Sequence, residues 1–92
     1  MTILVHLRKQ VMGGLWECQV LYDSENYIVS LFYGWGPSYP VASGIGKGPS
    51  YLSARDRAIE NSGRAEGDWS RLLPELDEMV YEATRYQVPE IS

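Results

Sequence analysis

The sequence predicts an α+β domain, with a three- to four-stranded antiparallel sheet and two C-terminal helices packed on one face. Residues 15–22 alternate between two sets of side chains with the period of a strand. A second strand-like run, residues 27–33, follows after four polar residues, which is typical of an antiparallel hairpin. Apolar residues in the last third recur at three-four spacing, the period of a helix.

The strands are bounded by recognisable breaks. Residues 2–12 are rich in Ile, Leu and Val, which favours a strand, with a short helix as the alternative. Gly13 and Gly14 end this run, and residues 23–26 have turn composition. Residues 34–49 hold five glycines and three prolines. We therefore expect any further strand there, over residues 39–43, to be short or irregular.

Two helices complete the chain. The first is expected to begin near Ser50 or Ser53 and to end at residues 61–63, where Asn-Ser-Gly is a typical helix end. Asp68 is a candidate cap for the second helical segment. Pro74 suits a first helical turn, so the regular part of the second helix is predicted from Pro74 to about Tyr86.

Length and composition narrow the class of protein. The 92 residues suffice for a single domain, 1–92, with one modest core. The net charge of −4 suits a basic protein surface better than free nucleic acid. The N-terminus does not resemble a secretory signal, and no apolar run approaches the roughly 20 residues of a membrane span. We therefore expect a cytoplasmic protein without a membrane partner.

The sequence offers little for catalysis. His6 is the only histidine and has no nucleophile or carboxylate near it in sequence, and Cys18 is the only cysteine. Glycines 44, 46 and 48 surround Lys47 but lack the spacing of a phosphate-binding loop. The carboxylates at 75, 77, 78 and 82 are typical of a solvated helix face, or could meet a basic partner. We predict no enzyme activity, cofactor, metal site or small-molecule substrate.

The segment from residue 33 to residue 57 is the most informative for binding. Its glycines allow close approach, its aromatic rings offer flat contact faces, and its basic residues gather around the start of a helix. The alternative is a connection whose aromatics fold back over the core. A second basic pair precedes it at the N-terminus. The predicted partner-binding residues are Tyr33, Trp35, Tyr39, Lys47, Ser50, Tyr51, Arg55, Arg57, Arg8 and Lys9.

Two resemblances bear on function. Gly44-x-Gly46 followed by Ser50-x-x-x-Ala54-Arg55, after three strands, resembles the end of a double-stranded RNA-binding domain. That resemblance implies a nucleic-acid-binding module as the alternative function. The family carries two lysines directly after the serine, whereas Tyr51 and Leu52 stand here.

A second motif, Gly48-Pro49-Ser50-x-Leu52-x-Ala54-x-x-Arg57-Ala58, is similar to one in small phage-encoded domains of α/β sandwich type. In size, acidity and aromatic content the chain resembles the phage anti-CRISPR inhibitors of type I systems. The resemblance implies an inhibitor that binds the Cas proteins of a host CRISPR effector complex in the cytoplasm of an infected bacterium, and it leaves open whether the crRNA is also contacted. Such an inhibitor blocks recognition of target DNA by occupying the surface of the complex.

Overall fold

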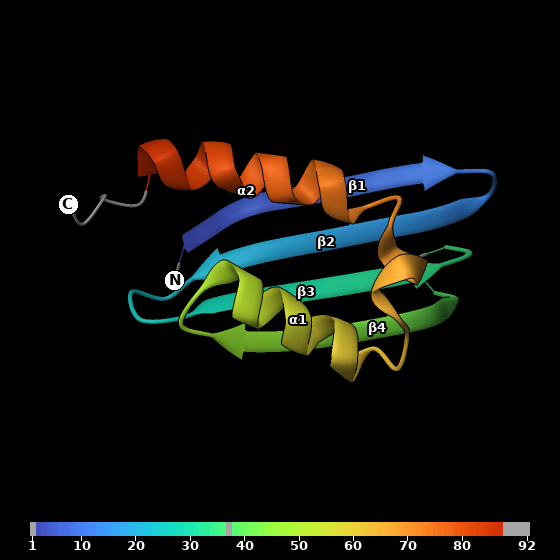
Figure 1. Ribbon diagram of the computed structural model, residues 1–92. Coiled ribbons are helices and arrows are strands. Elements are labelled where there is room, and N and C mark those ends of the chain that lie inside the picture. Colours follow the sequence, from blue (N-terminus) through green and yellow to red (C-terminus); the bar gives the residue numbers. More distant parts are fainter. Residues whose placement is uncertain (1, 37, 88–92) are drawn as a thin grey trace.

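The chain folds as four strands followed by helices (Figure 1). A computed structural model describes residues 2–36 and 38–87. The strands pair antiparallel in the order β1-β2-β3-β4. The elements are β1 (Thr2–Val11), β2 (Gly14–Tyr22), β3 (Tyr27–Gly34), β4 (Pro40–Gly48), α1 (Tyr51–Asn61), the 3-10 helix η1 (Glu66–Trp69) and α2 (Leu73–Gln87). The predicted α+β class, with two C-terminal helices, is confirmed.

Turn chemistry sets the registers of the first two hairpins. Met12 and Gly13 join β1 to β2 with φ values of 52° and 83°. Positive φ at both central residues is the signature of a two-residue type I′ hairpin turn. Between β2 and β3, the carboxylate of Asp23 accepts hydrogen bonds from the backbone N–H groups of Asn26 (2.8 Å) and Glu25 (3.3 Å). These bonds, the one from Asn26 foremost, lower the pKa of Asp23.

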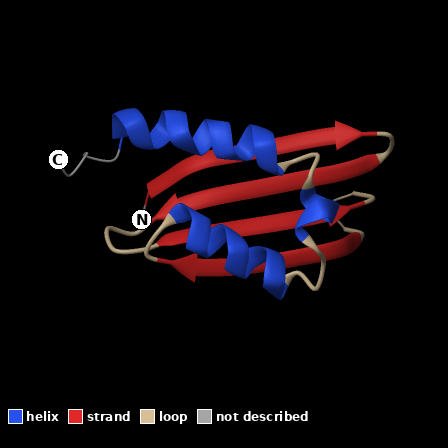
Figure 2. Cartoon of the chain, viewed as in Figure 1, coloured by secondary structure: helices blue, strands red, loops and turns tan. Residues whose placement is uncertain are grey.

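The core lies between the sheet and the helices, which all cover one face of the sheet (Figure 2). The alternation in β2 is confirmed, since Trp16, Cys18 and Val20 are buried beneath the helices. α1 packs on β3 and β4, and α2 packs on β1. Removing these side chains from water stabilises the fold by roughly 1.5–3 kcal/mol for each large apolar residue.

β4 is longer and more regular than its glycine content predicts. It continues through Gly44, Gly46 and Gly48, and all three glycines are buried. A Cβ built on Gly46 would lie 2.2 Å from the carbonyl oxygen of Ala54, and one on Gly44 would lie 2.2 Å from that of Ala58. The glycines therefore recur with the strand period because the backbone of α1 rests directly on them.

The opposite face of the sheet is covered by no element among the described residues. It presents the half-buried pair Leu21 and Ile28, next to the polar pair Gln19 and Ser30, and half-buried Phe32 opposite Glu17. A sheet face this mixed in polarity is compatible with solvent, as is common in antiparallel sheets. We call it the bare face.

Candidate functional site

The structure divides the predicted binding segment between the two ends of the sheet. β4 runs the length of the sheet between Tyr39 and Pro49, and its nine residues span roughly 25–30 Å at the usual rise of a strand. Trp35 and Tyr39 lie at one end, whereas Lys47, Ser50 and Tyr51 lie at the other (Figure 1). The predicted binding residues of this segment, although close in sequence, are therefore not brought together into one site.

At the helix-start end, Ser50 caps α1. Its hydroxyl oxygen accepts a hydrogen bond from the backbone N–H of Ser53 (3.1 Å), while the Ser53 hydroxyl accepts one from the N–H of Ser50 (3.2 Å). This reciprocal capping box satisfies donors that a helix start would otherwise leave unpaired. The box pairs Ser50 with Ser53, so Ser50 is the cap of the two serines at which the helix was expected to begin. Ser50 is thereby committed to the start of the helix.

Tyr51 and Arg55 are held by one carboxylate on α2. The Tyr51 hydroxyl donates to Oδ1 of Asp77 (2.5 Å), and Nη1 of Arg55 donates to Oδ2 (2.8 Å). Burial and the hydrogen bond to Asp77 raise the pKa of Tyr51. Burial would lower the pKa of Arg55, but the bond and charge of Asp77 outweigh burial and raise it. Arg55 also reaches Glu66 on η1 (3.4 Å), so it joins three helices.

Replacing Asp77 with asparagine is expected to lower the free energy of unfolding by about 2 kcal/mol. The amide keeps the size of the side chain but removes the negative charge, which leaves the Arg55 guanidinium with only more distant carboxylates. Only 15% of the Arg55 side chain is exposed, so water compensates poorly. Urea denaturation measures the change, with Glu78→Gln as the matched exposed control. A loss below about 0.5 kcal/mol would show that the network contributes little.

The other basic residues are dispersed. Arg57 donates from Nη1 to the carbonyl oxygen of Lys47 (2.5 Å), and Nζ of Lys47 lies 3.9 Å from Oδ2 of Asp23. Lys9 lies on β1 and pairs with Glu75 of α2 (3.2 Å). Arg8 projects from β1 beside Glu17 in the register. These cations do not form a continuous basic surface, because they are spread over β1, β4 and α1.

Among the described residues, the two turns at the other end of the sheet carry three large exposed apolar side chains, Met12, Trp35 and Tyr39. Their exposed fractions are 92%, 59% and 70%. Met12 belongs to the β1–β2 turn and the two aromatics to the β3–β4 turn, and both turns lie at the same end (Figure 1). We call these three residues the hairpin tips. Two backbone hydrogen bonds hold the second turn, from Trp35 N–H to the Tyr39 oxygen (3.0 Å) and from Tyr39 N–H to the Gly36 oxygen (3.1 Å).

Met12 is unusual in both conformation and exposure. Its φ of 52° lies in the left-handed region, which costs a non-glycine residue roughly 1 kcal/mol. Asparagine or glycine would adopt that conformation more easily, and an exposed thioether gains nothing from burial in the free chain. The folded chain therefore carries one small backbone penalty at Met12 and gains nothing from its side chain. Backbone strain of this kind is common where a chain contacts another molecule.

An aromatic row runs inward from the hairpin tips. The Tyr33 ring lies 6.1 Å from Trp35 and stacks on Trp16, with centroids 4.0 Å apart. Trp16 in turn meets the buried Trp69 edge to face at 5.8 Å. The row connects the core under η1 to the exposed end of the sheet. Trp35 is thus the exposed end of this row of aromatic rings.

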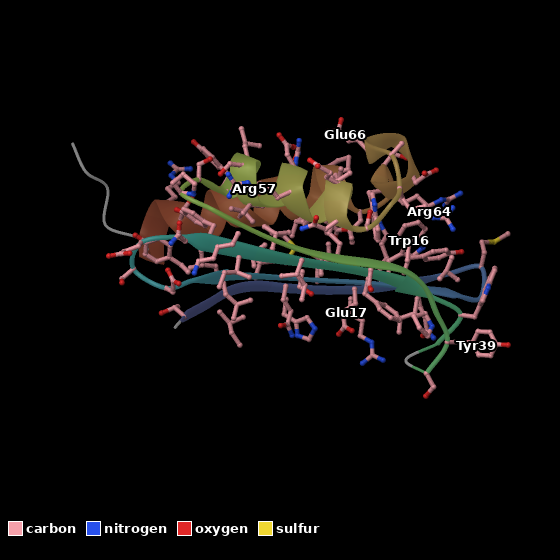
Figure 3. The ribbon with its side chains drawn as sticks, turned by 90° about the horizontal axis from the view of Figure 1, so that it is seen from below. Trp16, Glu17, Tyr39, Arg57, Arg64 and Glu66 are labelled. Atoms are coloured by element: carbon pink, nitrogen blue, oxygen red, sulfur yellow. The ribbon has the colours of Figure 1, made fainter. Side chains whose placement is uncertain are left out.

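A cavity of about 150 Å³ opens beside this row. Its lining comes from β2, β3, β4 and the segment around η1, and consists of Trp16, Tyr33, Ala42, Arg64, Asp68 and Trp69. Figure 3 shows Arg64 above Trp16 on the helix side of the sheet, and Tyr39 beyond the end of the sheet on the other side. The Arg64 side chain has no hydrogen bond or ion pair within the described residues. The cavity therefore combines an apolar floor with an available cation.

This arrangement suits the side chain of a partner better than a reaction. An apolar or aromatic group would fit against Trp16 and Trp69, while Arg64 could donate to a neighbouring carbonyl or carboxylate. The sequence did not single out Met12, Arg64 or Asp68 as binding residues. The sequence feature that bears on Arg64 is the preceding Gly63. Its φ of 73° ends α1 and turns the chain toward the aromatic row.

His6 and Cys18, the side chains with catalytic potential, do not line this cavity. His6 Nε2 lies 2.7 Å from Oε2 of Glu17 on the bare face. Burial, with a smaller contribution from Asp77, raises the pKa of the Cys18 thiol to about 12, so it is an unreactive thiol at neutral pH. Within residues 2–36 and 38–87, no three His, Cys, Asp or Glu side chains group as a metal site. None of the described helices has the length and apolar character to cross a membrane.

Comparisons of this chain with protein-family models, with characterised proteins and with solved structures find no match. The functional assignment therefore depends on the geometry of the chain itself.

Proposed function

We propose that this chain is a non-catalytic binding module that engages a partner protein through the hairpin tips and the adjoining aromatic cavity. The observation that carries this proposal is that Met12, Trp35 and Tyr39, all largely exposed, belong to the two turns at the end of the sheet near which the cavity lies. Isolated exposed apolar residues need no explanation, but a supported group of them marks a contact surface.

The hairpin tips have the properties of residues that contribute most of the binding energy of an interface. Tryptophan and tyrosine are enriched among residues whose truncation costs roughly 2 kcal/mol or more in protein interfaces. Each can remove roughly 150–250 Å² from water, and each has few rotatable bonds to immobilise. Trp35 also adjoins Tyr33, which stacks on Trp16. The rest of the contact is expected to be polar, with Arg64 at its border.

For the partner, we propose a host CRISPR ribonucleoprotein of type I, as the resemblance in character to phage inhibitors implies. The net charge of −4 favours approach to the basic surface that such a complex offers to DNA. Within the predicted set, Tyr33, Trp35 and Tyr39 would form the contact. The residues at the helix-start end would contribute only to a partner that also spans the length of β4.

The double variant Trp35→Ala and Tyr39→Ala is expected to weaken binding to a purified type I surveillance complex about a hundredfold. Two truncated anchors of roughly 1–2 kcal/mol each would produce this loss. Leu52→Ala is the matched control, because Leu52 is similarly exposed (57%) but lies on α1 at the opposite end. Affinity is measured by surface capture, and protection of target DNA from cleavage is followed in parallel.

Equal losses for the Leu52 control and the tip variant would contradict the tips as the contact surface. Failure of the unchanged chain to bind any type I complex would contradict the proposed partner. A gel-shift assay with naked double-stranded RNA tests the alternative of a nucleic-acid-binding module. That alternative requires a complex that weakens steeply with salt.

A further inference from the structure

The two edge strands of the sheet, β1 and β4, differ in how well their outward-facing backbone groups are covered. At β4, side chains from α1 cover outward-facing backbone carbonyls: Nδ2 of Asn61 donates to the oxygen of Ile45 (2.7 Å), and Arg57 donates to that of Lys47. Natural proteins commonly protect edge strands against pairing with other chains. The covered carbonyls make β4 a poor template for another strand.

Among the described residues, no side chain covers the backbone of β1 in this way. β1 is the longest of the four strands, with ten residues, and it pairs with β2 alone. Within the described part of the chain, no side chain or loop donates to or accepts from its outward-facing backbone groups. These groups are therefore available to an extended segment, which would gain main-chain hydrogen bonds along the strand.

A groove accompanies this open edge. α2 lies along β1 (Figure 1), and the two border an open groove of about 460 Å³ over the first half of the strand. Leu4, Val5 and Met79 supply its apolar part, and a row of glutamates from α2 supplies its rim. The register shifts between Ile3 and Val5 at this point, and the consecutive residues Leu4 and Val5 are both buried. The groove thus has room for side chains that an added strand would direct toward the helices.

The negative charge of the groove's rim determines which kind of segment the groove can bind. Glu75 is paired with Lys9, whereas Glu78 and Glu82 have no partner within the described residues. A second copy of the chain paired through β1 would bring its own α2 carboxylates toward these two, and like charges would oppose it. Lysine or arginine fits instead, because its aliphatic stem can lie on Leu4 and Met79 while its charged end reaches the rim.

We propose that the open edge of β1 and the adjoining groove bind an extended, lysine- or arginine-containing segment of a partner protein as a fifth strand of the sheet. This site is separate from the hairpin tips and does not depend on the function proposed for them. Alternate side chains of the segment enter the groove toward Glu78 and Glu82. The others extend the bare face beside Ile3.

The test uses an eight-residue peptide of alternating lysine and valine, blocked at both ends, added to the full chain. Two-dimensional NMR and amide hydrogen exchange locate its binding. Slower exchange at outward-facing amides of β1 is expected, with β4 unchanged. The double variant Glu78→Gln and Glu82→Gln should weaken binding about tenfold, and so should raising the salt concentration. Glu60→Gln on α1 is the matched control and should bind as the unchanged chain does.

A peptide with alternate amides methylated separates strand addition from simple charge attraction. It keeps every lysine but loses the donors that face β1, so binding should fall at least about tenfold. Equal binding of the methylated peptide would overturn the proposal, as would equal binding by the Glu78 and Glu82 variant. Protection mapped to β4, or sedimentation of the free chain as a dimer through β1, would overturn it too. Unchanged thermal unfolding of each variant confirms that these differences reflect binding.

Discussion

Replacing Trp69 with alanine is expected to lower the free energy of unfolding by about 4 kcal/mol, the range seen when a buried tryptophan is truncated. A domain of this size has roughly 5–10 kcal/mol in total, so the variant would be close to unfolding at room temperature. Only 1% of Trp69 is exposed. Its ring packs edge to face on Trp16, and its indole N–H donates to Oγ of Ser62 (3.2 Å).

The size of this effect follows from where Trp69 lies. It ends η1, between α1 and α2, and so anchors the connection between the two helices. Truncation would leave a large void and remove one of the hydrogen bonds that the Ser62 hydroxyl accepts at the same place. Chemical denaturation followed by circular dichroism measures the change. Trp35→Ala, which removes an exposed ring, should stay within about 0.5 kcal/mol of the unchanged chain. A loss below about 1.5 kcal/mol at Trp69 would contradict its role as an anchor.

Replacing Gly46 with alanine is expected to cost about 3 kcal/mol, although alanine adds only one methyl group. The new carbon would lie 2.2 Å from the Ala54 oxygen and 2.3 Å from the Ala58 nitrogen. Both are backbone atoms of α1 and cannot rotate away, so the helix must move off the sheet. The resulting gap would loosen the packing of Ala54 and Ala58, which are fully buried.

Gly67→Ala is the control for this substitution. A Cβ on Gly67 meets no atom within 4 Å, and its backbone is not in the left-handed region. Alanine there should leave stability unchanged or raise it slightly, since it restricts the unfolded chain. Thermal unfolding of the two variants gives the comparison. Similar melting temperatures for both would show that α1 does not rest on β4 as closely as the structure has it.

Much of the fold was predictable because local pattern and tertiary structure agree. The alternation in β2 and the three-four spacing in α2 each report which side chains are buried. β4 was underestimated, since glycine and proline ordinarily mark loops. Here Gly44, Gly46 and Gly48 are spaced by two because they share the helix-facing side of a strand. The spacing of two is visible in the sequence. Its cause, the close approach of α1 to the strand, is visible only in the structure.

The site was less predictable, because its parts come from distant segments. Trp35 and Tyr39 were singled out and are exposed. Tyr51 and Arg55 were singled out too, but they bind Asp77, which lies 26 and 22 residues further along the chain. No local pattern records such a pairing. Arg64 was missed for the same reason: it approaches Trp16 only after the chain has turned at Gly63.

Radical footprinting tests most directly whether the hairpin tips are the contact surface. The chain is oxidised both when free and when bound to a purified type I surveillance complex. Mass spectrometry reads the oxidation of each side chain. We predict strong protection of Met12, Trp35 and Tyr39 on binding, with Leu52 and Tyr81 unchanged although they are similarly exposed in the free chain. Protection of Leu52 and Tyr81, with the three tip residues still fully oxidised, would contradict the hairpin tips as the surface that binds.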